Sequence, residues 1–267
     1  GMDPQRDAAD LEQHPTLAHA AIQWCPRDAP RPSKPDPRNL VHGQAAMTPF
    51  LKICGLRSPM QAHAVAALGV EAIGVIAVPG STRWLEPQQR AAVFGAARQA
   101  NPACLGVLVV ADPEAALDAE LDPRAGGHQL LQLHGNETPE HCRTLSETLG
   151  CPVWKALRIR SPEDLKRAEA YQEVVAALLL DAWAPDQLGG SGRRLPIAWL
   201  EGFDPGCPWW LAGGLGPDNV SDVLKRLHPD GIDVSSGVEI APGDKDLARV
   251  AALVKAVKGS GGAAGGD

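Results

Sequence analysis

From Pro49 onward, short apolar runs alternate along the chain with longer segments of helical periodicity. The apolar runs lack the alternation of a half-exposed strand, and continuous apolar runs are typical of parallel strands covered on both faces. They recur at intervals of roughly 25 residues, enough for one strand and one helix. Eight such runs are present: Phe50–Cys54, Ala72–Val78, Cys104–Val110, Gln129–Leu133, Val153–Leu157, Ala176–Leu180, Trp209–Ala212 and Gly231–Val234.

Four of the intervening segments open with helix-start chemistry, a capping side chain followed by proline at the first helical position. These pairs are Ser58-Pro59, Asp112-Pro113, Thr138-Pro139 and Ser161-Pro162. The segment after the sixth run is the weakest, because residues 182–194 read as a long loop and only Pro196–Phe203 is left for a helix.

Eight strands, each followed by a helix-sized segment, predict a (β/α)8 TIM barrel of the phosphate-binding type. A doubly wound open sheet is the alternative, but it usually has fewer strands and an early glycine-rich turn. Here the glycine-rich turns follow the sixth, seventh and eighth runs. That placement favours the barrel, whose phosphate site commonly lies beyond its last two strands.

The ends of the chain differ from the barrel segment. Residues 1–46 include the proline-rich stretch Cys25–Pro37, which suits neither a helix nor a central strand. We therefore expect three parts: an N-terminal extension at 1–46 that is flexible or loosely docked, a barrel at 47–259, and a glycine-rich C-terminal tail at 260–267.

Charge and cysteine content limit the partners. The chain has 267 residues and a formal net charge of -7, which argues against nucleic acid or an anionic membrane as the main partner. No apolar run reaches the roughly 18 residues that span a bilayer, so we expect a cytoplasmic protein.

The six cysteines are scattered, with no paired spacing. A disulfide framework or zinc site is therefore not expected, and we predict neither metal nor cofactor.

In a barrel, functional residues stand at the C-terminal ends of strands. Cys54 ends the first run and Asp181 follows the sixth. Cys54 is either a small buried hydrophobe or, with Lys52 and Arg57 near it in sequence, a thiolate. Asp181 is either a loop cap or a partly desolvated general acid.

Other strand ends carry polar or glycine-rich groups. Arg83, after the second strand, is a surface arginine or a carboxylate ligand, and His134 is a structural partner or a ligand contact. Three loops have the flexibility and the backbone N–H groups to cradle a phosphate, and the seventh and eighth also read as helix starts. The candidate phosphate ligands are Gly190, Ser191 and Gly192, then Gly213 and Gly214, then Ser235, Ser236 and Gly237.

Taken together and in order, these residues resemble the phosphoribosylanthranilate isomerase family over about residues 50–258. The matching motifs are Lys52-Ile53-Cys54-Gly55, Ser81-Thr82-Arg83, Gln132–Gly135, Leu179–Asp181 with Gly189–Gly192, Leu211–Val220, Asp233–Glu239 and Pro242–Asp246.

The resemblance implies an isomerase of tryptophan biosynthesis that converts an aminoaldose to an aminoketose by an Amadori rearrangement without a cofactor. It implies Cys54 as base, Asp181 as acid and Arg83 as the group that engages the anthranilate carboxylate. Its small-molecule substrate carries a phosphoribosyl group. The resemblance leaves open whether the protein is a monomer or a homodimer.

The sequence departs from the family at Leu195–Ala198, where an aromatic group is usual, and at Ala77, where the second strand often has an aromatic residue. Two alternatives remain. One is another phosphate-binding barrel, either like indoleglycerol-phosphate synthase or like the histidine-pathway isomerase, which uses two aspartates. The other is a non-catalytic binder of phosphoribosyl ligands.

Overall fold

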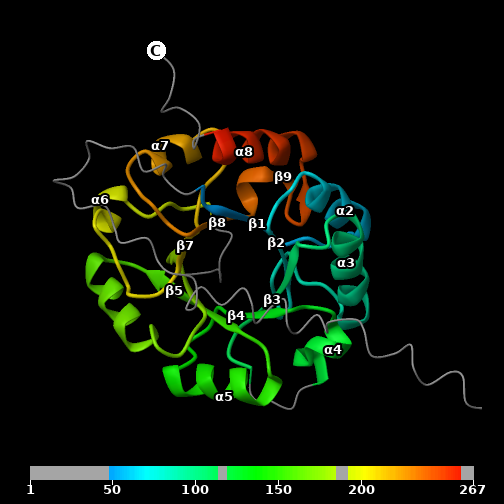
Figure 1. Ribbon diagram of the computed structural model, residues 1–267, viewed down its shortest axis with the longest axis horizontal. Coiled ribbons are helices and arrows are strands. Elements are labelled where there is room, and N and C mark those ends of the chain that lie inside the picture. The colour runs from blue at the N-terminus through cyan, green and yellow to red at the C-terminus, as the bar shows by residue number, and fades with distance from the viewer. Residues whose placement is uncertain (1–47, 114–118, 185–191, 260–267) are drawn as a thin grey trace, which may run out of the picture.

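The computed structural model describes residues 48–113, 119–184 and 192–259. Eight parallel strands close into a barrel in sequence order, and helices surround it (Figure 1). Their bounds are β1 Phe50–Cys54, β2 Ala72–Ile76, β3 Leu105–Val110, β4 Leu130–Leu133, β5 Val153–Ile159, β6 Ala177–Ala182, β7 Trp209–Leu211 and β8 Gly231–Val234. The barrel predicted from the apolar runs is therefore confirmed.

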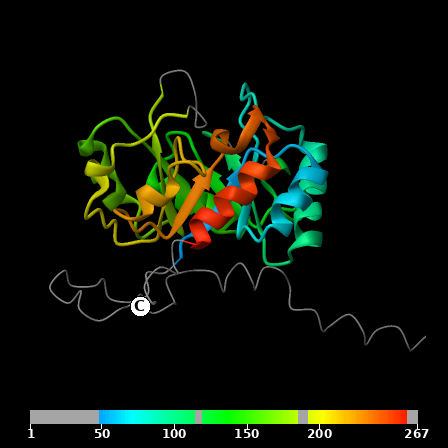
Figure 2. The same cartoon turned by 90° about the horizontal axis from the view of Figure 1, so that it is seen from above.

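In the described part of the chain, the outer layer contains α-helices and 3-10 helices. In the side view, α8 crosses the front of the barrel (Figure 2). The α-helices are α2 Pro59–Ala67, α3 Pro87–Ala100, α4 Pro123–Gly126, α5 Pro139–Leu149, α6 Ile197–Leu200, α7 Val220–Leu224 and α8 Leu247–Gly259, and the 3-10 helices are η1 Ala119–Leu121, η2 Pro162–Ala170 and η3 Ser236–Val238. A small hairpin of β9 Glu239–Ala241 and β10 Asp244–Lys245 follows η3. None of the helices that the structure describes is long and apolar enough to cross a membrane.

Two of the four predicted helix starts are confirmed by their caps. The Ser58 hydroxyl accepts from Gln61 N at the start of α2, and the Thr138 hydroxyl accepts from His141 N at the start of α5. Ser161 precedes η2, a 3-10 helix, and its side chain makes no cap bond.

The helix start predicted at Asp112 leads into residues 114–118, which lie outside the described residues. Asp112 itself has a φ of 47°, and its carboxylate accepts from Asn136 N in the next loop at 2.6 Å. Further along the chain, α4 starts at Pro123, where the Asp122 side chain accepts from Arg124 N.

Side chains from alternate strand positions fill the barrel interior. Two tryptophans, Trp154 and Trp210, occupy its lower part with ring centroids 4.5 Å apart. Small neighbours leave room for them: a Cβ on Gly231 would collide with the Trp210 ring, and Ala72 and Ala177 belong to the same cluster. Successive side chains of a strand point to opposite faces of the sheet. The interior-facing residues nearer the C-terminal strand ends than these tryptophans therefore line the mouth of the barrel.

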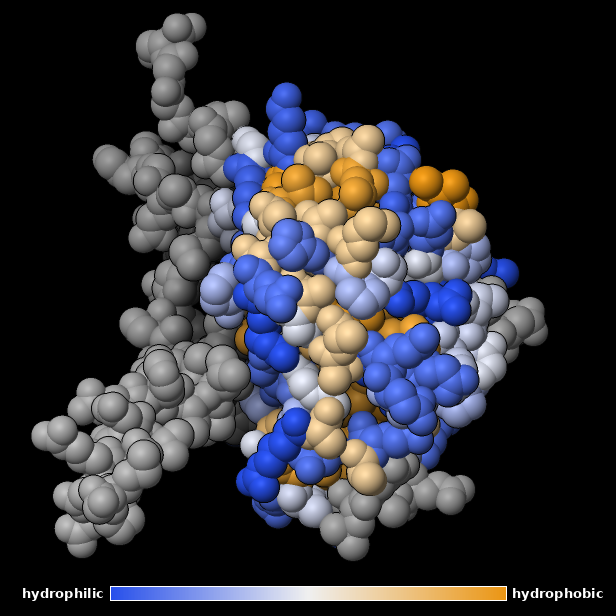
Figure 3. Space-filling model, turned by 90° about the vertical axis from the view of Figure 1, so that its right-hand side faces the viewer, coloured by the Kyte–Doolittle hydropathy of each residue, from blue (hydrophilic) through white to orange (hydrophobic). Residues whose placement is uncertain are grey.

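On the outer surface, the face that contains α2 and α3 mixes apolar and hydrophilic side chains (Figure 3). Met60 on α2 is 78% exposed, whereas Val65 and Phe94 from the two helices are fully buried. The helices thus direct their apolar sides inward, as expected for the cover of a barrel.

Candidate active site

A pocket opens at the C-terminal ends of the strands, where the sequence places its candidate chemistry. Eight of the predicted site residues line it: Cys54, Arg83, His134, Asp181, Gly213, Gly214, Ser235 and Ser236. Gly192 and Gly237 lie beside its loops, while Gly190 and Ser191 fall outside the described residues. The structure therefore brings together predicted site residues from six strand ends.

Cys54 ends β1 on the interior side and is 6% exposed. Its register partner on β2 is Gly74, and a Cβ there would lie 2.6 Å from the Cys54 Sγ, so the glycine leaves room for the thiol. Burial raises the pKa of Cys54, while the positive charges of Lys52 and Lys245 oppose the rise. Lys52 supplies a positive charge expected from the sequence, the second comes from Lys245 rather than from Arg57, and together they do not overcome the effect of burial.

Lys52 lies two residues before Cys54 on β1, so both face the interior. Its Nζ is 3.0 Å from Asp233 Oδ1 and 2.9 Å from Gln132 Oε1, and its side chain is fully buried. Burial alone would lower the pKa of Lys52, but the charges of Asp233 and Cys54 outweigh it and hold that pKa above its usual value. Lys52 is thus a fixed cation beneath the thiol.

Asp181 lies in β6, which extends two residues beyond the predicted end at Leu180. It is 3% exposed, and its Oδ2 is 3.4 Å from His134 Nε2. Its other oxygen, Oδ1, faces Gly213, where an added Cβ would lie 3.0 Å away. The carboxyl group is therefore held between the loop after β4 and the loop after β7.

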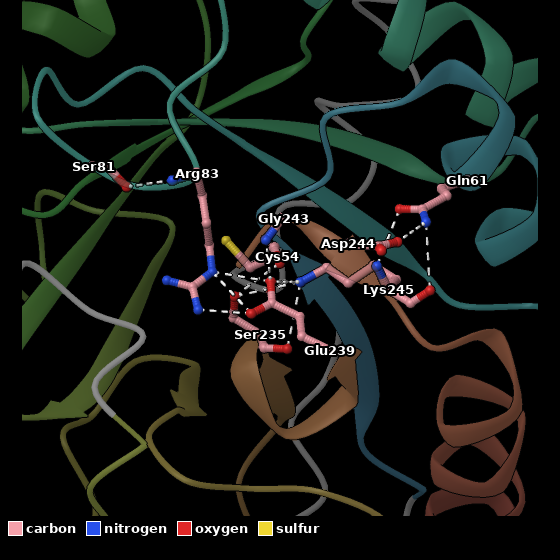
Figure 4. A network of polar contacts seen from close by, with 9 residues as sticks. All are labelled: Cys54, Gln61, Ser81, Arg83, Ser235, Glu239, Gly243, Asp244 and Lys245. Carbon is pink, nitrogen blue, oxygen red and sulfur yellow. Dashed lines mark hydrogen bonds and ion pairs between the residues drawn. The ribbon is translucent and has the colours of Figure 1, made fainter. Parts of the chain in front are cut away.

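Arg83 reaches the pocket from the loop after β2 and pairs with Glu239 (Figure 4). Its Nε and Nη2 donate to the Glu239 carboxylate at 3.0 and 2.7 Å, and Lys245 Nζ donates to the same carboxylate at 2.6 Å. Burial opposes ionisation of Glu239, but these two partners hold its pKa below the usual range. Arg83 therefore presents only its Nη1 side to a ligand, with one edge of its fork already used.

The three glycine loops predicted to hold phosphate adjoin one another. A Cβ on Gly214 would lie 2.5 Å from the Gly192 carbonyl oxygen, and a Cβ on Gly237 would collide with the Leu215 carbonyl oxygen. Gly213 and Gly214 also have φ values of 91° and 61°, which only glycine adopts readily. The loops after β6, β7 and β8 thus touch through their backbones.

The glycine loop after the seventh run is predicted to be a helix start, and α7 does follow it, starting at Val220 directly after Asn219. Asn219 makes no side-chain cap bond. Its side-chain Nδ2 instead donates to Gly214 O at 2.9 Å, and its side-chain Oδ1 accepts from Gly216 N at 3.1 Å. Asn219 therefore shapes the glycine loop from behind.

A larger cavity of about 480 Å³ lies beside α6 and α7. It shares Gly213 and Leu215 with the pocket described above, but it contains neither Cys54 nor Asp181. We therefore take the smaller pocket as the candidate active site.

Among the residues that the structure describes, no group of three or more histidine, cysteine, aspartate or glutamate side chains is placed to hold a metal ion.

Sequence reasoning noted Lys52 only as a charge near Cys54 in sequence, and it did not assign to the site four further residues: Gln132, Asp233, Glu239 and Lys245. For Lys52, Gln132 and Asp233 a signal was available, because each is a polar residue two positions before a candidate on an otherwise apolar strand. Glu239 and Lys245 belong to the β9–β10 hairpin, which no periodicity in the sequence announces.

The family model described as N-(5'phosphoribosyl)anthranilate (PRA) isomerase matches residues 51–256, nearly the whole barrel. The chain belongs to the phosphoribosylanthranilate isomerase family. This confirms the resemblance drawn from the strand-end motifs. The assignment agrees with Cys54 at the end of β1. A protein like the histidine-pathway isomerase, which uses two aspartates, would have an aspartate there.

Relatives named N-(5'-phosphoribosyl)anthranilate isomerase support the family assignment. The one from Synechococcus elongatus is 48% identical over 205 residues, covering 76% of this chain and 93% of the relative. The crystal structure of phosphoribosyl anthranilate isomerase from Thermotoga maritima has a TM-score of 0.71 and 29% identity, covering 79% of this chain and 99% of that one. The Thermus thermophilus structure gives a TM-score of 0.66 and 32% identity, covering 79% and 98%.

The two departures from the family pattern have packing explanations. Ala77 lies just after β2 and packs against the outer core rather than in the barrel interior. Leu195 is buried in that same core, and Ile197 and Trp199 pack against it. Neither departure reaches Cys54 or Asp181.

Proposed function

We propose that this chain converts N-(5'-phosphoribosyl)anthranilate to 1-(2-carboxyphenylamino)-1-deoxyribulose 5-phosphate by an Amadori rearrangement in L-tryptophan biosynthesis. The observation that carries the proposal is the presence of Cys54 and Asp181 in one buried pocket beside the adjoining glycine loops. One structural neighbour, 28% identical with a TM-score of 0.68, is a phosphoribosyl anthranilate isomerase in complex with reduced 1-(o-carboxyphenylamino)-1-deoxyribulose 5-phosphate.

In the proposed mechanism Asp181 starts protonated and donates its proton to the furanose ring oxygen. The C1′–O bond breaks, and the anilino nitrogen supplies the electron pair for a protonated Schiff base. Cys54, as thiolate, then removes the C2′ proton to give an enolamine, which tautomerises to the ketone. Lys52 and Lys245 favour the thiolate against the effect of burial.

Substrate binding uses both sides of the pocket. The phosphate lies against the backbone N–H groups of Gly190–Gly192, Gly213–Gly214 and Ser235–Gly237, whose loops leave no room for side chains at several positions. Arg83, held by Glu239, offers its remaining donors to the anthranilate carboxylate. His134 lies against Asp181 and contacts the ribose side of the substrate.

We also propose that the protein works in the cytoplasm as a monomer or a homodimer. The catalytic scheme requires no cofactor or metal, since both proton transfers are assigned to side chains. One structural neighbour is described as monomers generated from a dimeric phosphoribosylanthranilate isomerase of Thermotoga maritima, so in that protein both states have been observed.

The decisive experiment is a fluorescence assay that follows the loss of phosphoribosylanthranilate with purified protein. We expect turnover without added metal. A proton-transfer group typically supplies about 10²–10⁴-fold in rate, so Cys54→Ala and Asp181→Asn should each lose at least about 10²-fold in kcat. Cys54→Ser should be nearly as poor, because a hydroxyl is rarely ionised.

Binding of the reduced product analogue serves as the control and should change little in these variants. No decay above the spontaneous rate in folded wild-type protein would reject the activity. A Cys54→Ala variant that keeps more than about a tenth of wild-type kcat would reject Cys54 as the base.

A further inference from the structure

A row of buried polar side chains connects the cation beneath Cys54 to the carboxyl group of Asp181. Lys52 Nζ donates to Gln132 Oε1 at 2.9 Å, and Gln132 Nε2 lies 3.0 Å from His134 Nδ1. His134 Nε2 lies 3.4 Å from Asp181 Oδ2. All of these side chains face the barrel interior and are nearly excluded from solvent.

The donors and acceptors in this row permit only one arrangement. The Lys52 ammonium has donors and no acceptor, so it requires the oxygen of the Gln132 amide. The amide NH₂ group must then point toward His134. Because that group can only donate, His134 Nδ1 must accept, and an accepting Nδ1 carries no proton.

A neutral imidazole with an unprotonated Nδ1 carries its proton on Nε2. In the structure this atom is buried, and no residue in the described part of the chain gives it a hydrogen bond of good geometry. Asp181 Oδ2 is the acceptor in front of it, at 3.4 Å. His134 therefore directs an N–H toward the acid from the wall of the pocket.

We propose that Lys52 and Gln132 fix His134 as the neutral Nε2–H tautomer, and that His134 thereby positions Asp181 for proton donation. The proposal rests on the assignment of Asp181 as the general acid. With His134 Nε2–H beside Oδ2, at an Nε2–Oδ2 distance of 3.4 Å, the acid proton is directed to Oδ1, the oxygen that faces Gly213. The opposite tautomer would turn a lone pair toward Asp181 and accept the proton intended for the substrate.

Nitrogen-15 NMR of the histidine rings tests the tautomer directly. In wild-type protein we expect His134 Nδ1 to give the signal of an unprotonated ring nitrogen and Nε2 that of a protonated one. Gln132→Glu keeps the shape but replaces the NH₂ by a carboxylate oxygen, so Nδ1 should become protonated. The buried ring of His128 lies elsewhere in the barrel and should keep its signals, which provides an internal control.

Kinetics test the positioning role. Gln132→Glu should lower kcat by at least about tenfold, part of the 10²–10⁴-fold that a general acid supplies, with KM little changed. His134→Gln places an amide N–H near the position of Nε2, whereas His134→Asn reaches only the position of Nδ1. His134→Gln should therefore lose clearly less kcat than His134→Asn, while a purely structural histidine would make the two variants equal.

A protonated Nδ1 in wild-type His134 would overturn the proposal whatever the activities, even if every variant failed to fold. Equal kcat values for His134→Gln and His134→Asn would overturn the positioning role. Failure of the proposed function is a separate result, because it would appear as no turnover by the folded wild-type protein while the wild-type ring signals stayed as expected.

Discussion

Arg83 shows how one side chain can serve two partners. Its planar fork has five donors in fixed directions, and two of them already bind Glu239. The Glu239 carboxylate is in turn held by Lys245 and by Gly243 N, so the guanidinium has a rigid support. The remaining donors are thereby presented to the pocket in a fixed orientation.

We expect Arg83→Lys to weaken catalysis although it keeps the charge. A lysine ammonium is a point charge that cannot hold Glu239 and a substrate carboxylate with the same planar geometry. A charge-assisted bond contributes about 1.5–3 kcal/mol, so kcat/KM should fall at least about tenfold. Steady-state kinetics at matched folding, checked by thermal melting, provide the measurement. Kinetics equal to wild type would exclude the carboxylate role.

His128 is a second residue whose burial has a measurable consequence. Its ring is 2% exposed and packs near Phe94, and within the described part of the chain neither ring nitrogen has a well-formed hydrogen bond. Burial lowers the pKa of His128 from 6.5 to about 4. Below its unfolded pKa the unfolded chain binds a proton that the folded chain does not, so stability falls as the pH drops toward 4.

A shift of this size corresponds to about 3 kcal/mol of unfolding free energy lost between about pH 6.5 and about pH 4. His128→Phe removes the titrating group and keeps a ring of similar size. Urea unfolding at about pH 7 and about pH 4.5 should show a clearly smaller loss of stability for the variant. The same loss in both proteins would mean that other groups control the acid response.

At the scale of elements, the loops after β7 and β8 approach each other closely through their backbones. Backbone atoms of one loop occupy the space where another residue's Cβ would stand, as with Gly237 and the Leu215 carbonyl. Asn219 ties the loop after β7 together through Gly214 and Gly216. Such close contacts leave the backbone N–H groups as the natural ligands of a phosphate.

Gly237→Ala should therefore both destabilise the protein and weaken substrate binding. The added Cβ meets a backbone carbonyl, which cannot move aside as a flexible side chain could, so we expect a loss of more than about 1 kcal/mol together with a higher KM. The matched control is Gly95→Ala in α3, where an added Cβ meets nothing within 4 Å. That helical substitution should stabilise the protein by about 0.5–1 kcal/mol.

Denaturant unfolding and substrate titration of both variants decide the matter. If Gly237→Ala had the same stability and KM as the wild type, the close approach of the two loops would contribute neither to stability nor to substrate binding.

At the scale of the whole molecule, the barrel closes by pairing β1 with β8, from Phe50 opposite Gly231 to Ile53 opposite Val234. The family match covers 51–256, the same part of the chain. Residues 1–47 lie outside the described structure, and the division into an extension, a barrel and a C-terminal tail stays a prediction.

A chain that begins at Met47 should keep the fold and the activity. This expectation rests on the proline content of the N-terminal extension and on a family match that begins only at residue 51. Its melting temperature should lie within a few degrees of that of the full chain, and kcat should be unchanged. Insoluble protein or a large drop in melting temperature would show that the extension packs on the barrel.

The sequence by itself determined the eight strands, two helix caps and the strand ends that carry chemistry. These features depend on a few adjacent residues, since an apolar run, a capping serine or a strand-end cysteine is local information. Local information does not show, in contrast, that the Asp112 carboxylate binds the amide of Asn136 from another loop.

Only the tertiary structure decided which polar residues meet. Lys52 pairs with Asp233 across 181 positions of sequence, and Arg83 pairs with Glu239 across 156. Such pairs form because barrel closure brings the first two strands and their loops beside the last strand and the hairpin after it, and no local pattern encodes that proximity. The orientation of Gln132, and through it the proton on His134, follows from contacts of this kind.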